Sequence, residues 1–209
     1  MKKTILWDFD GVILDSMKVR DSGFEKIFKD FDPVLIEQLL EYHRKNGGLS
    51  RYVKIRYFFE VVLGKPISDE GVLEYAHKFS LIMRKELTNT SNLILDSVNF
   101  IERNYNKYNF HIVSGSDGEE LRYLCKSLKL SDFFISINGS PTPKNELVKD
   151  VLVKYSYDVN TCMLIGDSIN DFEAAKVNNI KFLGYNNIEI QGLDGYINNF
   201  SNFIFPIKN

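Results

Sequence analysis

Residues 5–16 read ILWDFDGVILDS, an apolar run that leads into Asp8, Asp10 and Gly11. A short apolar run that ends at a glycine turn is typical of a buried β-strand, so we expect a strand over residues 5–9. The two aspartates would then stand at the carboxyl end of this strand, which makes that end the first candidate for a functional site.

Strand and helix patterns alternate along the chain after residue 92. Such alternation with short connections is typical of the α/β class, here a Rossmann-like parallel sheet with helices on both faces. The tail, residues 192–209, is expected to add a short edge strand. The helices are predicted near residues 96–106, 118–128, 144–155 and 170–177, and the strands over residues 110–114, 133–137, 162–165 and 180–183.

Residues 16–88 carry apolar side chains at helical spacing instead. Pro33, the pair Gly47-Gly48 and Gly64 interrupt this pattern and divide it into four predicted helices. We therefore predict an α/β catalytic core of residues 1–15 and 89–209 and an inserted four-helix cap of residues 16–88. Because the insert leaves the chain just after the first strand, it can form a lid over the carboxyl end of that strand.

Acidic side chains follow two of the predicted strands. Asp8 and Asp10 follow the first strand, and Asp167 and Asp171 follow the strand of residues 162–165. Ligands of open parallel sheets bind outside the carboxyl ends of the strands, where these side chains should converge. Four carboxylates around one crevice repel each other unless a cation lies between them. Oxygen ligands without histidine favour magnesium or calcium over zinc, and magnesium also takes phosphate oxygens of a substrate.

A carboxylate in such a site can attack phosphorus and form an aspartyl phosphate, which water then cleaves. The charge on the transferred group needs hydrogen-bond donors and cations. Ser114 offers a hydroxyl, Gly115 a backbone N–H near the start of a predicted helix, and Lys144 a positive charge. Asp10 can protonate the leaving oxygen and later deprotonate the water.

These motifs resemble those of the haloacid dehalogenase superfamily, in its branch of capped phosphatases and β-phosphoglucomutase-like enzymes. Residues 8–16 are similar to the first motif of the family, residues 113–116 to the second, Lys144 to the third, and residues 165–171 to the fourth. The resemblance covers nearly the whole chain, in the family order and with the insert in the usual cap position. Related enzymes often carry proline after the third-motif lysine, whereas Asn145 follows it here.

The resemblance implies a role for each matched residue. Asp8 would be the nucleophile and a magnesium ligand, Asp10 the general acid/base and a ligand through its backbone carbonyl, and Asp167 a further ligand. Asp171 would orient the metal site without being a direct ligand. An aspartate at position 10 also favours phosphoester chemistry, because dehalogenases and phosphonate hydrolases of the superfamily lack it. The residues implied to hold the phosphoryl group are Ser114 and Lys144.

Arg51 and Lys54 lie one helical turn apart in the predicted cap, just after the turn Gly47-Gly48. They could face the crevice and grip an acidic or hydroxylated substrate, which makes Arg51 a candidate substrate-binding residue. A solvated first turn of a helix, capped by Ser50, is an equal alternative. The three histidines show no ligand spacing, so structural roles are expected for them.

The composition excludes several classes of partner. The chain has 209 residues with 26 Lys plus Arg and 28 Asp plus Glu, a net charge of −2. This balance gives no overall attraction to nucleic acid or to an anionic membrane, and neither is expected as a partner. No apolar stretch approaches the length of a membrane span, and the apolar start is too short for a signal peptide, so a cytoplasmic location is expected.

We therefore expect a Mg²⁺-dependent phosphatase that hydrolyses a small phosphorylated metabolite, a sugar phosphate or similar compound, through an aspartyl phosphate. A β-phosphoglucomutase-like phosphomutase is the alternative, because the same phosphoenzyme could pass its phosphoryl group to a second hydroxyl. A non-catalytic module that binds phosphorylated ligands is a third hypothesis, and the intact acidic set argues against it. The oligomeric state stays open, and a monomer is compatible with the sequence.

Overall fold

The computed structural model describes residues 2–201 and 203–205 of the chain. Its described residues contain one six-stranded sheet with the order β3-β2-β1-β4-β5-β6, and every paired neighbour is parallel. This confirms the predicted α/β class. The strands are β1 (Thr4–Trp7), β2 (Asn109–Asp117), β3 (Ser136–Ser140), β4 (Cys162–Gly166), β5 (Lys181–Tyr185) and β6 (Tyr196–Ile197).

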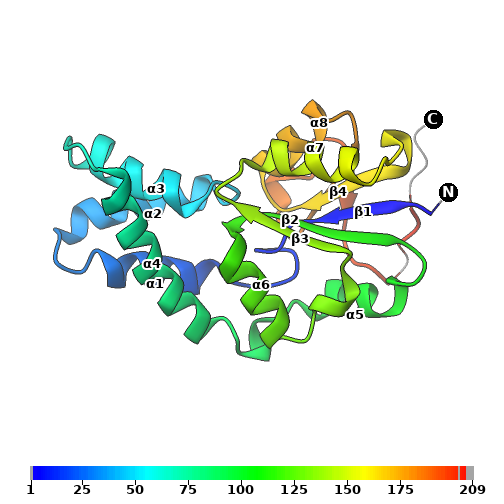
Figure 1. The fold of residues 1–209 in the computed structure, drawn as a ribbon, viewed down its shortest axis with the longest axis horizontal. Helices are drawn as coiled ribbons and strands as arrows, with labels where there is room; N and C mark the ends of the chain where they lie inside the picture. Colours follow the sequence, from blue (N-terminus) through cyan, green and yellow to red (C-terminus); the bar gives the residue numbers. More distant parts are fainter. Residues whose placement is uncertain (1, 202, 206–209) are drawn as a thin grey trace.

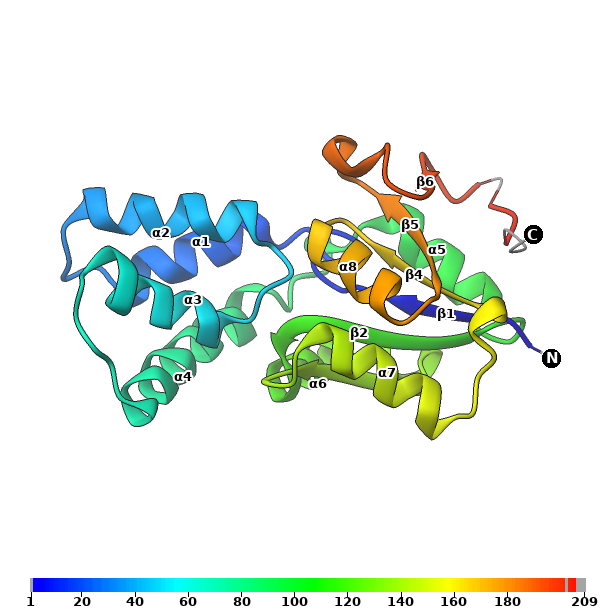
Figure 2. The same cartoon turned by 90° about the horizontal axis from the view of Figure 1, so that it is seen from above.

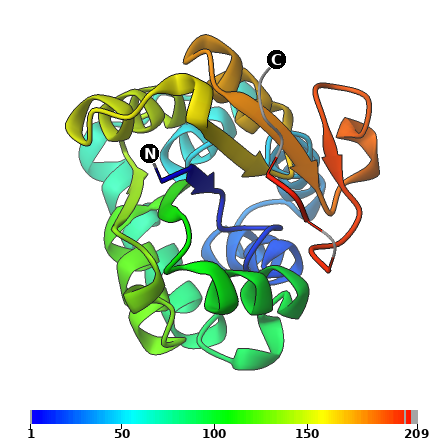
Figure 3. The same ribbon diagram turned by 90° about the vertical axis from the view of Figure 1, so that its right-hand side faces the viewer.

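Helices cover both faces of the sheet, as predicted. Figure 1 shows α7 and α8 on one face and α5 and α6 on the other, and Figure 3 shows the same two layers along the strands. Parallel strands need crossover connections, and these helices supply them. The four crossover helices are α5 (Leu95–Asn104), α6 (Gly118–Ser127), α7 (Lys144–Lys154) and α8 (Ile169–Val177).

The central strand β1 separates two apolar clusters because its side chains alternate between the faces. Ile5 and Trp7 belong to the larger cluster, which includes residues of α5 and α6. Leu6 belongs to the smaller cluster, which is built largely from α7 and α8. All three side chains are fully buried, so β1 is fixed in the middle of the molecule, and the residues that follow it are fixed with it.

The residues between β1 and α5 form a helical insert, defined here as residues 17–86, all of which the structure describes. Three of its α-helices have side-chain N-caps: Asp32 accepts from the Val34 N–H, and Ser50 and Ser68 cap the two helices that follow. Figure 2 shows the insert beside the end of the sheet toward which β1 points. Its four α-helices are α1 (Met17–Ile27), α2 (Pro33–Lys45), α3 (Arg51–Tyr57) and α4 (Asp69–Glu86), with a π-helical turn at Phe58–Val62.

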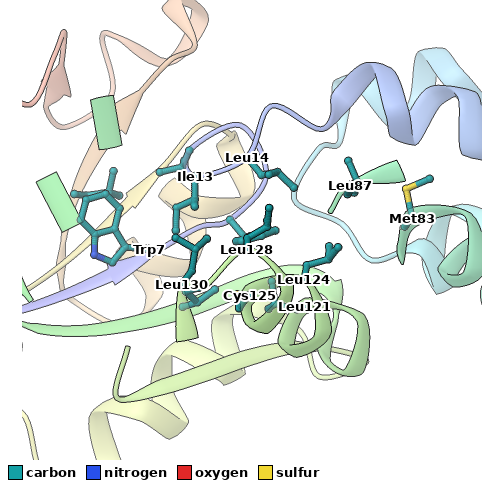
Figure 4. Close-up of a cluster of buried hydrophobic side chains, with 14 of the residues drawn as sticks. Trp7, Ile13, Leu14, Met83, Leu87, Leu121, Leu124, Cys125, Leu128 and Leu130 are labelled. Atoms are coloured by element: carbon teal, nitrogen blue, oxygen red, sulfur yellow. The ribbon is translucent and has the colours of Figure 1, made fainter. Parts of the chain in front are cut away.

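Two chain segments join the insert to the sheet, and they pair with each other. The Asp15 N–H donates to the Asn92 carbonyl at 2.8 Å, and the Ile94 N–H donates to the Ile13 carbonyl at 2.9 Å. Figure 4 shows the larger apolar cluster continuing past this junction, from Trp7 to Met83 of α4. That the insert acts as a cap, and that the domain boundaries fall at residues 16 and 88, stay predictions.

The structure differs from the expected elements at β3. A strand was predicted over residues 133–137, whereas β3 covers Ser136–Ser140, and residues 131–133 form a 3₁₀ turn. The Phe133 ring packs against Tyr105 of the segment after α5, at a centroid distance of 5.2 Å. Phe133 is therefore packed against a neighbouring ring and does not form part of a strand. The short edge strand expected in the tail is present as β6, and positions 202 and 206–209 of that tail lie outside the described residues.

Across the described part of the chain, none of the helices combines the length and the apolar character that crossing a bilayer would need.

Candidate active site

The acidic residues that follow β1 and β4 meet at the carboxyl end of the sheet. The two strands pair directly, with Trp7 opposite Ile165, so the residues after them are neighbours. One carboxylate oxygen from each of Asp8, Asp167 and Asp171 lies within 4.8 Å of the others. The sequence predicted that the first and fourth motifs converge, and the structure brings them together.

Gly11 allows this close approach. Its φ of +74° lies in the left-handed region, and a Cβ placed on it would come 1.9 Å from Oδ2 of Asp167. A side chain at position 11 would therefore push Asp167 away from Asp8. The glycine of the first motif is needed both for the turn and for the space that the acidic cluster occupies.

Lys144 is the cation of the cluster. Its ammonium lies 2.8 Å from Oδ1 of Asp8 and 2.5 Å from Oδ1 of Asp171, and all three side chains are buried. The other carboxylate oxygen of Asp171 accepts from the backbone N–H of Ser168 at 3.1 Å and from its hydroxyl at 2.5 Å. Burial lowers the pKa of Lys144, but the carboxylates of Asp171 and Asp8 outweigh it and raise that pKa above its usual value.

One lysine does not compensate the charge of three carboxylates, of which Asp8 and Asp171 are buried and Asp167 is half-buried. Burial, and then the charge of Asp171, raises the pKa of Asp8 from 3.8 to about 7. Burial, and then the charge of Asp8, raises the pKa of Asp167 well above its usual range. A divalent cation between these oxygens would remove the repulsion, and an all-oxygen donor set suits magnesium. The side chains present therefore fit a magnesium ion.

The carboxylate of Asp10 points to a different set of partners. Its oxygens accept from the hydroxyls of Ser16 and Ser116, both at 2.5 Å, and from Nε of Arg20 at 2.8 Å. Burial raises the pKa of Asp10, but Arg20 and these hydroxyls outweigh it and lower that pKa below its usual value. Asp10 is thus held ionised by residues of β2 and α1, outside the acidic cluster that contains Asp8.

A cavity opens over Asp8, Asp10 and Asp167, between the sheet and the insert. Its volume is about 60 Å³, enough for a few water molecules. Ser114 and Gly115, the expected phosphoryl-binding residues of the second motif, line it. Lys144 reaches Asp8 from outside this lining set.

The insert lies in direct contact with the strand that carries the second motif. A Cβ on Gly115 would come 2.2 Å from the carbonyl oxygen of Gly48, so the loop before α3 packs against bare backbone. The Tyr52 hydroxyl donates to Asp117 at 2.7 Å across the same boundary. The insert therefore closes over the carboxyl end of the sheet in this structure.

Arg51 and Lys54 are buried beside this cavity, with 4% and 3% of their surface exposed. The alternative of a solvated first turn is therefore wrong. Arg51 donates to Glu120 at 2.7 Å and to Ser80 at 2.6 Å, and Lys54 donates to the Gly47 carbonyl at 3.2 Å. Burial, and then the charge of Arg20, lowers the pKa of Lys54 to about 7. Contact of either residue with a substrate stays a prediction.

Arg20 and Glu120 also belong to this site, although neither was predicted from the sequence. Arg20 follows Ser16 by four residues, the spacing of neighbours on a helix, and this was a usable signal because Ser16 belongs to the first motif. Glu120 looks like an ordinary acidic residue in the first turn of α6. Its complete burial depends on packing against the insert, which no local pattern reveals.

Asp8→Asn should change how stability depends on pH when divalent cations are chelated. With a pKa of 3.8 unfolded and about 7 folded, ionised Asp8 weakens the folded state progressively as pH rises from about 4 to about 7. Relative to wild type, the variant should therefore gain unfolding free energy across this window, on the order of a few kcal/mol. Urea denaturation of both proteins in EDTA, near the two ends of the window, measures the difference. A difference that does not change with pH would contradict the repulsion described here.

Comparison with known proteins gives one sequence family and many similar folds. The family model described as haloacid dehalogenase-like hydrolase matches residues 5–185. No curated protein sequence matches the chain.

Three solved structures illustrate the shared fold. β-Phosphoglucomutase from Clostridium difficile is 18% identical, with a TM-score of 0.76 over 98% of this chain and 94% of that one. A CbbY mutant from Rhodobacter sphaeroides, in complex with xylulose-(1,5)bisphosphate, is 13% identical, with a TM-score of 0.76 over 97% and 96%. The hydrolase YfnB from Bacillus subtilis, solved bound to magnesium and showing interdomain movement, is 17% identical, with a TM-score of 0.68 over 93% of each chain.

Proposed function

We propose that this chain, which belongs to the haloacid dehalogenase-like hydrolase family, is a magnesium-dependent phosphatase that uses Asp8 as its nucleophile. The observation that carries the proposal is the buried cluster of Asp8, Asp167, Asp171 and Lys144 at the carboxyl end of the central strands. A carboxylate nucleophile, oxygen ligands for a cation and a fixed ammonium are the groups that phosphoryl transfer needs.

In this proposal Asp8, Asp167 and the backbone carbonyl of Asp10 hold the magnesium ion. Asp171 orients Lys144 and the loop at Ser168, with which it already interacts. When bound, magnesium neutralises charge on the phosphoryl oxygens and allows the carboxylate of Asp8 to approach them. Lys144, Ser114 and the backbone of Gly115 would bind the remaining oxygens. Ser16, Ser116 and Arg20 hold the carboxylate of Asp10 away from this ligand set, and its proposed role in proton transfer requires it to leave them.

The reaction then has two steps. In the first, a carboxylate oxygen of Asp8 forms a bond to phosphorus while the bond from phosphorus to the leaving oxygen breaks. Because Arg20 and the two hydroxyls hold Asp10 ionised, its carboxylate must first leave these partners and take up a proton from solvent. The carboxyl of Asp10 then gives that proton to the leaving oxygen. In the second step a water molecule attacks phosphorus and loses a proton to Asp10, which releases inorganic phosphate and restores Asp8.

The insert would act as the cap in this cycle. The cavity lies between the sheet and the insert, which touch at Gly48 and Gly115, so the insert would move away to admit a substrate and then return. Movement between domains in YfnB is consistent with this proposal. Return of the insert excludes bulk water from the acidic cluster and places the side chains of α1 and α3 around the substrate.

Gly115→Ala should impair this closure. The new Cβ would meet the Gly48 carbonyl at 2.2 Å, a backbone atom that cannot turn aside. We expect kcat/KM to fall by roughly 10²-fold, because a small displacement of the catalytic groups is costly. Steady-state hydrolysis of p-nitrophenyl phosphate measures it, with Gly192→Ala as the control, since a Cβ there meets nothing within 4 Å. Equal activity of the two variants would show that the contact between the insert and β2 has no role in turnover.

The substrate class that fits best is a small phosphorylated metabolite such as a sugar phosphate. Purified protein with magnesium should release inorganic phosphate from members of a panel of such compounds. The phosphomutase alternative draws on the fold shared with β-phosphoglucomutase and on the contact of the insert with β2, which would limit the access of water. Incubation with a hexose 1-phosphate separates the two, because a phosphatase yields free phosphate and a mutase yields the 6-phosphate. A cytoplasmic location remains part of the proposal.

A further inference from the structure

Glu120 is a fully buried carboxylate that lies behind two arginines of the cavity wall, Arg20 and Arg51. It lies in the first turn of α6, a helix that packs on the sheet and does not belong to the insert, and 0% of its surface is exposed. Both of its carboxylate oxygens face arginines of the insert. Oε2 accepts from Nη1 of Arg51 at 2.7 Å, and Oε1 lies 3.4 Å from Nη1 of Arg20.

The charges of the two arginines that the insert contributes to the cavity wall are therefore offset by carboxylates of the protein itself. Arg20 also pairs with Asp10 at 2.8 Å, so two arginines face the two carboxylates of Asp10 and Glu120. Among the described residues that line the cavity, Lys54 is the cation without a carboxylate at ion-pair distance. A single phosphate group carries about 1.5 to 2 negative charges at neutral pH. Lys144 and a divalent ion would already face the carboxylates of Asp8, Asp167 and Asp171, so Lys54 is the cavity cation left for a ligand.

Polar atoms without partners remain on the same wall. Nε and Nη2 of Arg51 and both ring nitrogens of His43 are buried, and no hydrogen-bond partner for them occurs in the described chain. His43 is uncharged, because burial and then the charge of Lys54 lower its pKa to about 2. These groups can donate to, or accept from, neutral oxygen atoms such as hydroxyls, and leaving them unpaired in a complex is unfavourable.

We propose that Glu120 determines substrate specificity, by neutralising the arginines of the insert and so restricting the site to a monophosphate whose remaining part carries no second anionic group. A second phosphate in the cavity would face Arg20 and Arg51, whose positive charges are already offset by the carboxylates of Asp10 and Glu120. Like charges brought together at a desolvated site cost several kcal/mol. The inference rests on the proposed function and narrows its substrate class. It also favours hydrolysis over mutase chemistry, which must accommodate phosphate at two positions of one molecule.

The test compares binding of two ligands that differ by one phosphate. Glucose 6-phosphate and glucose 1,6-bisphosphate are titrated with magnesium by calorimetry into the Asp8→Asn protein, which prevents turnover. We expect the bisphosphate to bind at least about tenfold more weakly. In Asp8→Asn/Glu120→Gln the amide keeps the size of the side chain and removes its charge, which frees Arg51. The ratio of the two Kd values should then shift at least about tenfold toward the bisphosphate.

Glu119→Gln in the same Asp8→Asn background is the matched control. Glu119 is the neighbouring residue on α6, but its side chain is 82% exposed, so the same loss of charge should leave the ratio of Kd values unchanged. The inference is overturned if Glu120→Gln leaves the ratio at the value of this control, or if neither ligand binds. If the Glu120→Gln protein does not fold, the two Kd values of the Asp8→Asn protein still test the inference. Tighter binding of the bisphosphate than of the monophosphate would overturn it.

Failure of the inference and failure of the proposed function give different results. Absence of any phosphatase turnover by the wild-type protein would overturn the proposed function. Intact turnover with the bisphosphate preferred would overturn the role of Glu120 alone.

Discussion

Asp8→Asn should lower the rate of phosphate release by at least about 10⁴-fold, down to the background of the assay. The amide nitrogen and oxygen of the new side chain keep the shape of the carboxylate but cannot form the bond to phosphorus. The carboxylate of Asp8 lies 2.8 Å from the Lys144 ammonium and within 4.8 Å of the Asp167 carboxylate, so it borders both the ammonium and the proposed metal site. Initial rates with saturating p-nitrophenyl phosphate and magnesium measure the effect.

A matched control is needed because the change also alters charge. Asp150→Asn makes the same substitution at an exposed position of α7 and should retain wild-type turnover. Both variants should remain folded, which thermal unfolding followed by circular dichroism checks. If the folded Asp8→Asn protein turns over substrate at a rate within tenfold of wild type, Asp8 is not the nucleophile.

Removal of divalent cations should lower turnover by at least about 10³-fold, and added magnesium should restore it. The physical reason is the buried acidic cluster. Without a cation, the phosphoryl group would approach Asp8 and Asp167 against their negative charge, with Lys144 as the nearest compensating group. Dialysis against EDTA followed by titration with magnesium chloride provides the measurement, and EDTA already saturated with magnesium is the control for effects of the chelator.

A second readout does not depend on activity. Magnesium should raise the unfolding temperature of the wild-type protein, because an ion that binds only the folded state stabilises it. The gain should be lost in Asp167→Asn, which removes one proposed ligand. The proposed metal site would be excluded if turnover is unchanged after chelation and magnesium does not change the unfolding temperature of either protein.

Much of the fold follows from local patterns. The apolar run before Asp8 and the run before Asp167 each predict a buried strand, and the rule that parallel strands present their ligands at one end predicts that the two aspartates meet. The structure confirms the parallel sheet and brings the carboxylates of Asp8 and Asp167 together. These predictions succeed because they depend on periodicity and on one general property of parallel sheets.

The less successful predictions depend on tertiary packing. Phe133 and Phe134 have strand propensity, yet Phe133 belongs to a 3₁₀ turn, and β3 starts only at Ser136. Arg51 was equally compatible with solvent and with the cavity, and its burial follows from the ion pair with Glu120, 69 residues away in the sequence. Charged residues are rarely buried without a partner, and a single sequence does not show which partner is available.

The account depends most on the covalent step at Asp8. An acyl phosphate can be reduced to an alcohol by borohydride, whereas a free carboxylate is not reduced. Wild-type protein turning over p-nitrophenyl phosphate with magnesium should therefore be quenched rapidly into borohydride, digested and analysed by peptide mass spectrometry. We predict reduction of the Asp8 side chain, dependent on both substrate and magnesium. Reduction at a different carboxylate, or an unmodified Asp8 in protein quenched during active turnover, would contradict the account.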